Sequence, residues 1–172
     1  MEGSAMLAAA AIDFDSWARA GAGIPTAPSG SSAVLVECRL SRIVLRENSD
    51  QQYIYLEEKN GTRSFPIVIG FFEAMEIDRK IKERSVVRPL THDLLRVAIE
   101  QLGAKLRGIE ICALRENTFF ANLVLDHGGE TLRIDCRPSD AIALAVAQKA
   151  PIAVEEAVIA TAVSSGKPDL PA

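Results

Sequence analysis

Apolar and polar residues alternate along the first part of the chain in a way that predicts β-strands. Residues Val34–Leu45 are mostly β-branched and apolar, and their alternation slips midway, which predicts a bulge. Two further strand-like runs, Tyr53–Leu56 and Arg63–Ile69, flank Asn60 and Gly61. Because both of those residues tolerate positive φ, the pattern predicts a hairpin closed by a two-residue turn.

The apolar period changes to that of a helix in two later segments. Segment 71–82 places apolar residues on one broad arc, with Asp78 in its middle, where a carboxylate needs a partner. A second helix is predicted to begin with Thr91 as its N-cap and to end near Gly103. The residues expected to face the core are Phe71, Ala74, Met75, Ile77 and Ile81 in the first helix and Leu94, Leu95, Ala98, Ile99 and Leu102 in the second.

The rest of the pattern predicts a strand meander followed by a buried helix. Strands are predicted at 106–114, 118–125 and 131–136, with short turns typical of antiparallel neighbours. Pro138 suits the first turn of a helix, and Ala141–Ala147 is apolar on every side. The predicted fold class is α+β, with mostly antiparallel strands in two hairpin or meander groups and about three main helices, one of them largely buried.

Composition separates this domain from both ends of the chain. Residues 21–32 are rich in Gly, Pro and Ser, which indicates a linker. We therefore expect a flexible N-terminal tail over 1–32, one domain over 33–163 and a C-terminal tail over 164–172. The apolar run at 6–12 has no basic residue before it and is followed by acids, so no secretion signal and no membrane span is expected.

Charge and cysteine content limit how the protein can bind phosphates and in which compartment it works. The formal net charge is −4, so contact with phosphates requires a local basic patch rather than the field of the whole molecule. The cysteines are odd in number, far apart and set in strand-like runs, which predicts buried thiols rather than disulfides or a zinc site. They are Cys38, Cys112 and Cys136. We expect a cytoplasmic protein.

The strongest candidate site lies where the last predicted strand passes into the buried helix. Asp135, Arg137, Ser139 and Asp140 converge there. A helix N-terminus offers unpaired N–H groups and a positive dipole to an anion, so these residues predict a phosphate-binding site. For the polar row of that strand, Thr131, Arg133, Asp135 and Arg137, a solvated face with ion pairs is the alternative interpretation.

Several motifs, in order along the chain, resemble the bifunctional nuclease domain family. They are FPIVIG at 65–70 with Glu73-Ala74 after it, RPLTHDLL at 88–95, TFFA at 118–121 and DCRPSDAIALA at 135–145. The resemblance runs through nearly the whole domain. It implies the fold of that family, nuclease activity on RNA and DNA, and nucleic acid as the partner.

Cleavage of a phosphodiester needs an activated water or hydroxyl, neutralisation of charge at the phosphate and help for the leaving oxygen. The chain has two histidines, His92 and His127, and the second lies in a predicted turn, so a two-histidine mechanism is not favoured. Carboxylates that hold Mg²⁺ or Mn²⁺ are the other common route. We therefore predict a metal-assisted nuclease with catalytic residues Asp135, Asp140, His92 and Asp78 and metal ligands Asp135, Asp140, Glu73 and Asp93.

Substrate binding is predicted at a basic stretch between the first two helices. Its residues are Arg79, Lys80, Lys82, Arg84 and Arg88. A helix end, where the dipole favours cations, explains this stretch equally well. Arg137 and Ser139 are expected to add contacts to phosphate. Aromatic residues make up 5% of the chain, and Tyr53 and Tyr55 are the ones expected to be exposed.

A different class of function fits the same sequence. It is a non-enzymatic binding or regulatory module in which Asp135, Arg137 and Asp140 serve only the fold. Geometry distinguishes the two, because an enzyme would gather these groups with His92 and Asp78 in one open cleft. The amount of apolar strand and helix also predicts a homodimer or a higher homo-oligomer.

Overall fold

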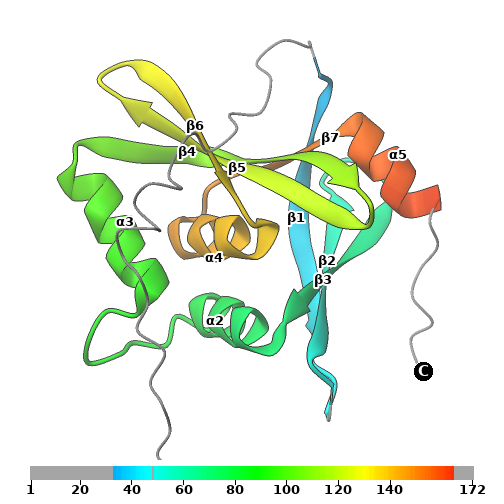
Figure 1. Cartoon of the computed structure of the whole chain (residues 1–172), viewed down its shortest axis with the longest axis horizontal. Coiled ribbons are helices and arrows are strands. Elements are labelled where there is room, and N and C mark those ends of the chain that lie inside the picture. Colours follow the sequence, from blue (N-terminus) through cyan, green and yellow to red (C-terminus); the bar gives the residue numbers. More distant parts are fainter. Residues whose placement is uncertain (1–32, 48, 165–172) are drawn as a thin grey trace, which may run out of the picture.

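A single seven-stranded sheet organises the molecule, with strand order β3-β2-β1-β7-β4-β5-β6 (Figure 1). The computed structural model describes residues 33–47 and 49–164, so the tails predicted at 1–32 and 164–172 lie outside the described residues except for Ser164, which is the last residue of a helix. The strands are β1 (Leu35–Val44), β2 (Gln51–Glu58), β3 (Ser64–Gly70), β4 (Ala104–Arg115), β5 (Thr118–His127), β6 (Glu130–Cys136) and β7 (Ile152–Glu155). The helices are α2 (Phe71–Ile81), α3 (Thr91–Gln101), α4 (Pro138–Gln148) and α5 (Glu156–Ser164).

The short strand β7 joins the two predicted strand groups. It pairs antiparallel with β1 and parallel with β4, so the hairpin group β1-β2-β3 and the meander β4-β5-β6 form one sheet. The sequence analysis did not predict β7, because four residues are too few for alternation to be recognised. The α+β class and the mostly antiparallel sheet are confirmed.

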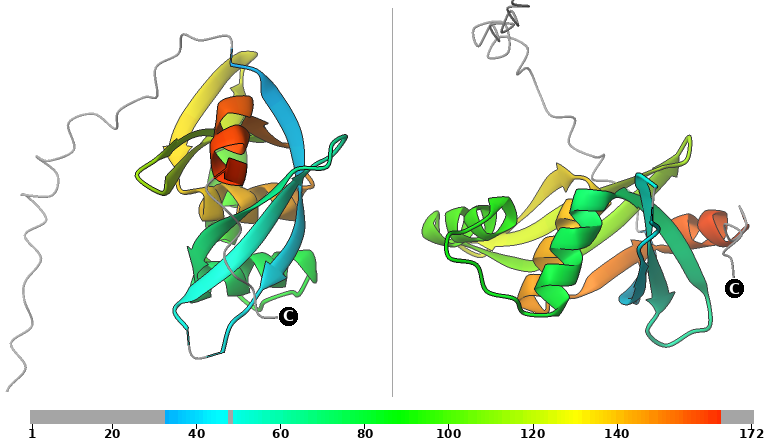
Figure 2. Two further views of the ribbon diagram at one scale, coloured as in Figure 1. Left: turned by 90° about the vertical axis from the view of Figure 1, so that its right-hand side faces the viewer. Right: turned by 90° about the horizontal axis from the view of Figure 1, so that it is seen from below.

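Helix α4 lies at the centre of the fold, next to α2 and in contact with α3 (Figures 1 and 2). Its buried residues, as its apolar sequence predicts, are Pro138, Ser139, Ala141, Ile142, Ala143, Leu144 and Ala145. A helix that is apolar all round is stable only when it is enclosed, and here the sheet and α2 enclose it. Charged groups at its first turn are therefore held on a rigid base.

The apolar arcs predicted for α2 and α3 are mostly not covered. Only Ala74, Ile77 and Ile99 are buried among the ten expected core residues. Leu94 is 62% exposed and Leu102 is 76% exposed. The expectation was wrong for these residues because an amphipathic pattern tells which face is apolar and not whether the same chain covers it.

The hairpin between β2 and β3 is confirmed, but its two-residue turn is not. The Glu58 amide donates to the Arg63 carbonyl at 3.1 Å, so four residues form the loop, and Asn60 and Gly61 both have negative φ. The Glu58 carboxylate folds back to accept the Arg63 amide at 3.2 Å. A Cβ on Gly61 would collide with that carboxylate, so this glycine permits a close approach rather than a left-handed turn.

Tyr53 and Tyr55 are buried, contrary to the expectation that they are exposed. The guanidinium groups of Arg46 and Arg42 lie over their rings, 5.9 and 4.1 Å from the ring centroids. Cation–π contact therefore replaces solvent on these rings. At 7% and 2% exposure, neither ring is an exposed platform for stacking on nucleic-acid bases.

The three cysteines are free, in agreement with the prediction that they form no disulfide. Cys38 is buried, and burial raises the pKa of its thiol to about 11. Burial likewise raises the pKa of Cys136 to about 12. Both thiols are therefore protonated at neutral pH and are poor nucleophiles.

Candidate functional site

The first turn of α4 holds the centre of a network of charged side chains. Asp140 accepts two hydrogen bonds from Arg137, from Nε at 2.7 Å and from Nη2 at 3.0 Å. His92, at the start of α3, lies with Nε2 3.1 Å from the same carboxylate. The hydrogen bond from His92 and the Arg137 guanidinium outweigh burial and hold the pKa of Asp140 at about 2. Asp140 is therefore ionised at neutral pH, and Nε2 of His92 is the donor.

Arg137 links this carboxylate to α2. Its Nη1 donates to Oε1 of Glu73 at 2.8 Å, so the guanidinium is held between two acids. Glu73 lies against the backbone of Gly70, where a Cβ would collide with the Glu73 carboxylate. The φ of Gly70 is −74°, so a close approach and not backbone conformation requires glycine there. With 65% of its side chain exposed, Arg137 is the member of the network most open to a ligand.

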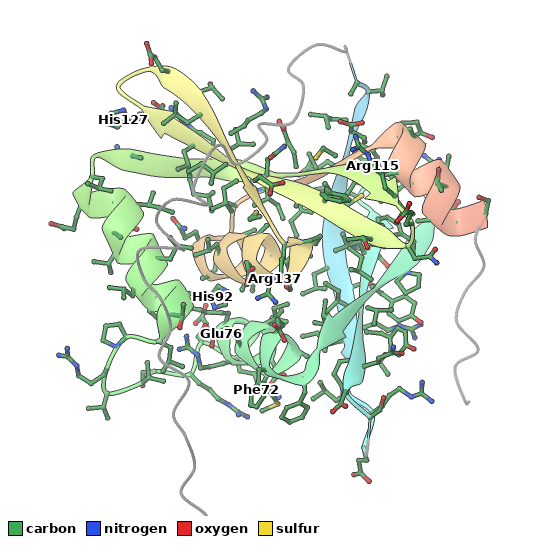
Figure 3. The ribbon with its side chains drawn as sticks, in the orientation of Figure 1. Phe72, Glu76, His92, Arg115, His127 and Arg137 are labelled. Carbon is green, nitrogen blue, oxygen red and sulfur yellow. The ribbon has the colours of Figure 1, made fainter. Side chains whose placement is uncertain are left out.

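Glu76 connects His92 to a second, more buried part of the network. Its Oε1 is 3.8 Å from Nδ1 of His92, and both of its oxygens accept from Arg79 at 2.7 Å. Burial raises the pKa of Glu76, but Arg79, Lys80 and His92 together hold it below its usual value. Figure 3 shows Glu76 and His92 side by side, with Arg137 nearby between α2 and α4.

Asp93 ends the network and also caps α3. It accepts from Arg79 at 2.8 Å, forms an ion pair with Lys80 and accepts the backbone amide of Leu90 at 3.0 Å. Burial raises the pKa of Asp93, but these donors hold it below its usual value. Leu90 is the N-cap of α3 and Thr91 its first residue, so the predicted N-cap was wrong by one position. The Asp93 carboxylate, and not the side chain of the N-cap residue, satisfies a backbone amide at the start of α3.

The structure brings together seven of the predicted site residues. These are Glu73, Arg79, Lys80, His92, Asp93, Arg137 and Asp140. Arg79 and Lys80 point into the network, with side chains 15% and 8% exposed, so carboxylates already neutralise them. Of the predicted basic stretch, only Arg84 and Arg88 have no ion-pair partner among the described residues.

Asp135 and Asp78 do not join this network. Asp135 lies on β6 opposite Asn122 and, by the alternation of a strand, points to the face opposite Cys136, away from the core. Asp78 forms an ion pair at 2.8 Å with Lys82, the C-cap residue of α2. The four predicted catalytic residues therefore do not line one cleft. His127 is exposed at the β5–β6 turn, far from His92 (Figure 3).

Glu76 is the member of the network that the sequence analysis missed. It lies three and four residues before Arg79 and Lys80, a spacing that places all three side chains on one face of a helix. That spacing was the available signal. Its contact with His92 crosses from α2 to α3, and only the tertiary structure reveals it.

A pocket of about 610 Å³ adjoins the exposed side of the network. Glu73, Arg137 and Ser139 line one part of it, and Val68, Phe119 and Leu114 are among its apolar walls. Ser139 is only 6% exposed, and no described residue hydrogen-bonds to its hydroxyl. An unpaired hydroxyl at a helix N-terminus, next to an arginine, is suited to bind an anion.

The donor set does not fit a preformed site for Mg²⁺ or Mn²⁺. No group of three or more His, Cys, Asp or Glu side chains within residues 33–47 and 49–164 is placed to hold a metal ion. Asp140 and Asp93 already accept hydrogen bonds from cationic side chains, and Asp135 lies on another face. Metal dependence stays a prediction.

Comparison with known proteins places this chain in a family. A model of the bifunctional nuclease domain matches residues 54–166. The chain belongs to the bifunctional nuclease domain family. It is similar to an uncharacterised protein of Mycobacterium tuberculosis, with 40% identity over 126 residues that cover 73% of this chain and 75% of that protein.

Plant members of the family are more distant. Bifunctional nuclease 2 of Oryza sativa subsp. japonica is 27% identical over 116 residues, which cover 65% of this chain and 36% of that protein. Bifunctional nuclease 1 of Arabidopsis thaliana is 27% identical over 107 residues, which cover 60% of this chain and 33% of that protein. The chain thus matches about a third of these plant proteins. None of the helices in its described part is long and apolar enough to cross a membrane.

Proposed function

We propose that the chain is a nuclease that hydrolyses phosphodiester bonds of RNA or DNA at the mouth of the pocket beside α4. The observation that carries this proposal is the position of Arg137. It is exposed, it is held by Glu73 and Asp140, and it lines the same pocket as the unpaired Ser139 hydroxyl. The names of the distant plant relatives support the same reaction class.

Each residue at the pocket mouth has a separate role in this proposal. The fork of Arg137 binds two oxygens of the scissile phosphate, and Ser139 donates to a third. Glu73 accepts the proton of the attacking water through Oε2, to which no described residue hydrogen-bonds. The water oxygen bonds to phosphorus as the bond to the leaving oxygen breaks, and that oxygen takes a proton from solvent.

Asp140 and His92 act as positioning residues in this scheme. Asp140 holds the guanidinium through two hydrogen bonds, and His92 donates to Oδ1 of Asp140, the oxygen that also accepts from Nη2 of Arg137. His92 does not line the pocket, so it does not reach the phosphate directly. The apolar walls around Phe119 are suited to receive a base or sugar of the substrate.

The test is cleavage of single-stranded RNA and DNA by wild type and by Arg137→Gln, with and without EDTA. We expect the variant to remain folded and to lose cleavage about a hundredfold or more, because it loses the phosphate fork. Arg39→Gln is the matched control, since Arg39 is 66% exposed and pairs with Glu57 on a distant strand. Equal cleavage by wild type and a folded Arg137→Gln variant would overturn the proposed site. Loss with EDTA would support the predicted metal.

A second candidate function has its own supporting observation. The carboxylates of Asp93 and Asp140 are saturated by cationic partners, as in a network that only stabilises a fold. This agrees with a non-enzymatic binding or regulatory module. Purified protein that binds oligonucleotides without cleaving them, in the presence or absence of Mg²⁺ and Mn²⁺, would favour this module over the nuclease.

A further inference from the structure

Strand β6 forms one end of the sheet and leaves a long edge uncovered. It follows β5 in the strand order, and no described strand pairs with its other side (Figure 1). Every residue of β6 except Cys136 is exposed. An edge strand presents a row of unpaired N–H and C=O groups, which pair with another strand unless something prevents it.

The side chains of β6 are self-complementary about Ile134. Leu132, Ile134 and Cys136 share the face on which Cys136 packs against the core, and Arg133 and Asp135 share the other face. Around Ile134 the sequence is therefore flanked by one basic and one acidic residue and then by two apolar residues. A second copy that runs antiparallel meets this pattern in reverse.

Symmetry and charge select one register for such a pair. A two-fold axis normal to the sheet pairs only residues of the same face, so the axis must pass through a residue position. With the axis at Ile134, Arg133 lies opposite Asp135 of the second copy, twice over. An axis at Arg133 or at Asp135 would place like charges opposite each other, which is destabilising. An axis at Leu132 would place Glu130 opposite Ile134.

The two charged residues of β6 differ in the contacts that they make within one chain. None of the described residues forms an ion pair or a hydrogen bond with the side chain of Asp135. Arg133 donates to Glu110 through Nε at 2.8 Å and Nη2 at 3.0 Å, which leaves Nη1 free. Glu110 is on β4, so in the single chain the guanidinium is turned toward the interior of the sheet, and it swings to the free edge of β6 to pair with Asp135 of the second copy.

We propose that two copies of the chain associate through antiparallel pairing of their β6 strands, with Ile134 on the two-fold axis. The pairing extends the seven-stranded sheet across both copies and satisfies the edge. It covers Leu132 and Ile134, which are 40% and 43% exposed. Arg133 and Asp135 of one copy form two reciprocal ion pairs with Asp135 and Arg133 of the other. Ile134 contacts Ile134 of the second copy.

This dimer places the two pocket mouths on the same seam. Arg137 lies three residues beyond Ile134, so the two Arg137 residues stand about 20 Å apart along the strand direction, at about 3.3 Å per residue. Both would lie at ends of the paired strands. The pairing rests on β6 alone and does not depend on the proposed nuclease function.

Charge reversal tests the ion pairs by light scattering at concentrations from 5 to 100 µM (about the range in which weak dimers are resolved). Wild type is expected to have the mass of two chains. Asp135→Arg places arginines opposite each other and is expected to shift the mass to one chain. Adding Arg133→Asp restores opposite charges and is expected to restore the dimer. A monomeric wild type, or a variant Asp135→Arg that stays dimeric, would overturn the proposal.

A disulfide test measures the register and does not depend on the folding of the charge variants. Ile134→Cys places two thiols on the axis, where Cα atoms of opposed residues are about 4.5 to 5.5 Å apart, within the range of a disulfide. We expect a covalent dimer on mild oxidation. Val68→Cys is the control, because Val68 is 52% exposed on the other edge strand, β3. No crosslink at residue 134, or an equal crosslink at residue 68, would contradict the register.

Discussion

Helices α3 and α4 have the same length and opposite environments. Each has 11 residues, yet seven residues of α4 are buried and only Ile99 of α3 is. Apolar burial on several sides fixes α4. The start of α3 is instead joined to its neighbours by charged contacts, from His92 to Asp140 and from Asp93 to Arg79 and Lys80. The candidate site therefore has two halves: α4 is held by packing of the core, and the start of α3 is held by ion pairs.

This difference shows which forces set the geometry of the pocket mouth. Arg137 and Ser139 belong to the enclosed half, so their positions depend on packing of the core. His92 and Asp93 belong to the half that charged groups hold, so their positions depend on ionisation. Substitutions in the two halves should therefore differ in size and in response to pH.

The largest expected effect comes from the core of α4. Leu144 is 1% exposed, so Leu144→Ala should lower the free energy of unfolding by about 3 kcal/mol through lost burial and a cavity. Leu94 on α3 is 62% exposed, and Leu94→Ala should change the same quantity by less than about 0.5 kcal/mol. Urea unfolding of both variants measures this. Similar losses would mean that the face of α3 is covered in solution.

A smaller effect is expected at the ion pairs that hold α3. Glu76→Gln leaves Arg79 and Lys80 with Asp93 as their only carboxylate, at sites 15% and 8% exposed. We expect a loss of about 2 kcal/mol in the free energy of unfolding, less than for a fully buried pair. Glu100→Gln, which removes an exposed pair with Arg96, should cost about 0.3 kcal/mol. Equal values from denaturant unfolding would show that Glu76 contributes no more stability than one exposed ion pair.

The third effect is a dependence on pH. The pKa of Asp140 is about 2 in the folded state. It is about 3.9 in an unfolded chain, so ionised Asp140 stabilises the fold above about pH 4, and this is lost as pH falls toward 2. Asp140→Asn removes this contribution. The stability difference between wild type and variant should therefore shrink between about pH 5 and pH 2.5, and a constant difference would contradict the assigned contacts.

Periodicity predicted local structure well and long-range assembly poorly. The strands, α4 and the convergence of Arg137, Ser139 and Asp140 follow from residues close in sequence. Strand β7 could not be predicted because its four residues are defined by partners from distant segments. The same limit applies to Glu76, whose partner His92 lies on another helix. Asp135 was grouped with Asp140 by proximity in sequence, but strand alternation turns it to the other face.

The most direct test of the central claim is the single-turnover cleavage rate of Glu73→Gln, with oligonucleotide binding measured on the same preparation. The substitution keeps the shape of the side chain that Arg137 contacts, and it removes the base. Glu57→Gln is the matched control, because Glu57 also pairs with an exposed arginine, on a distant strand.

The account predicts that Glu73→Gln binds the oligonucleotide within about threefold of wild type and cleaves it at least about a hundredfold more slowly. The control should bind and cleave like wild type. A folded Glu73→Gln variant that cleaves at the wild-type rate would contradict the proposed role of Glu73 and the placement of the reaction at this pocket.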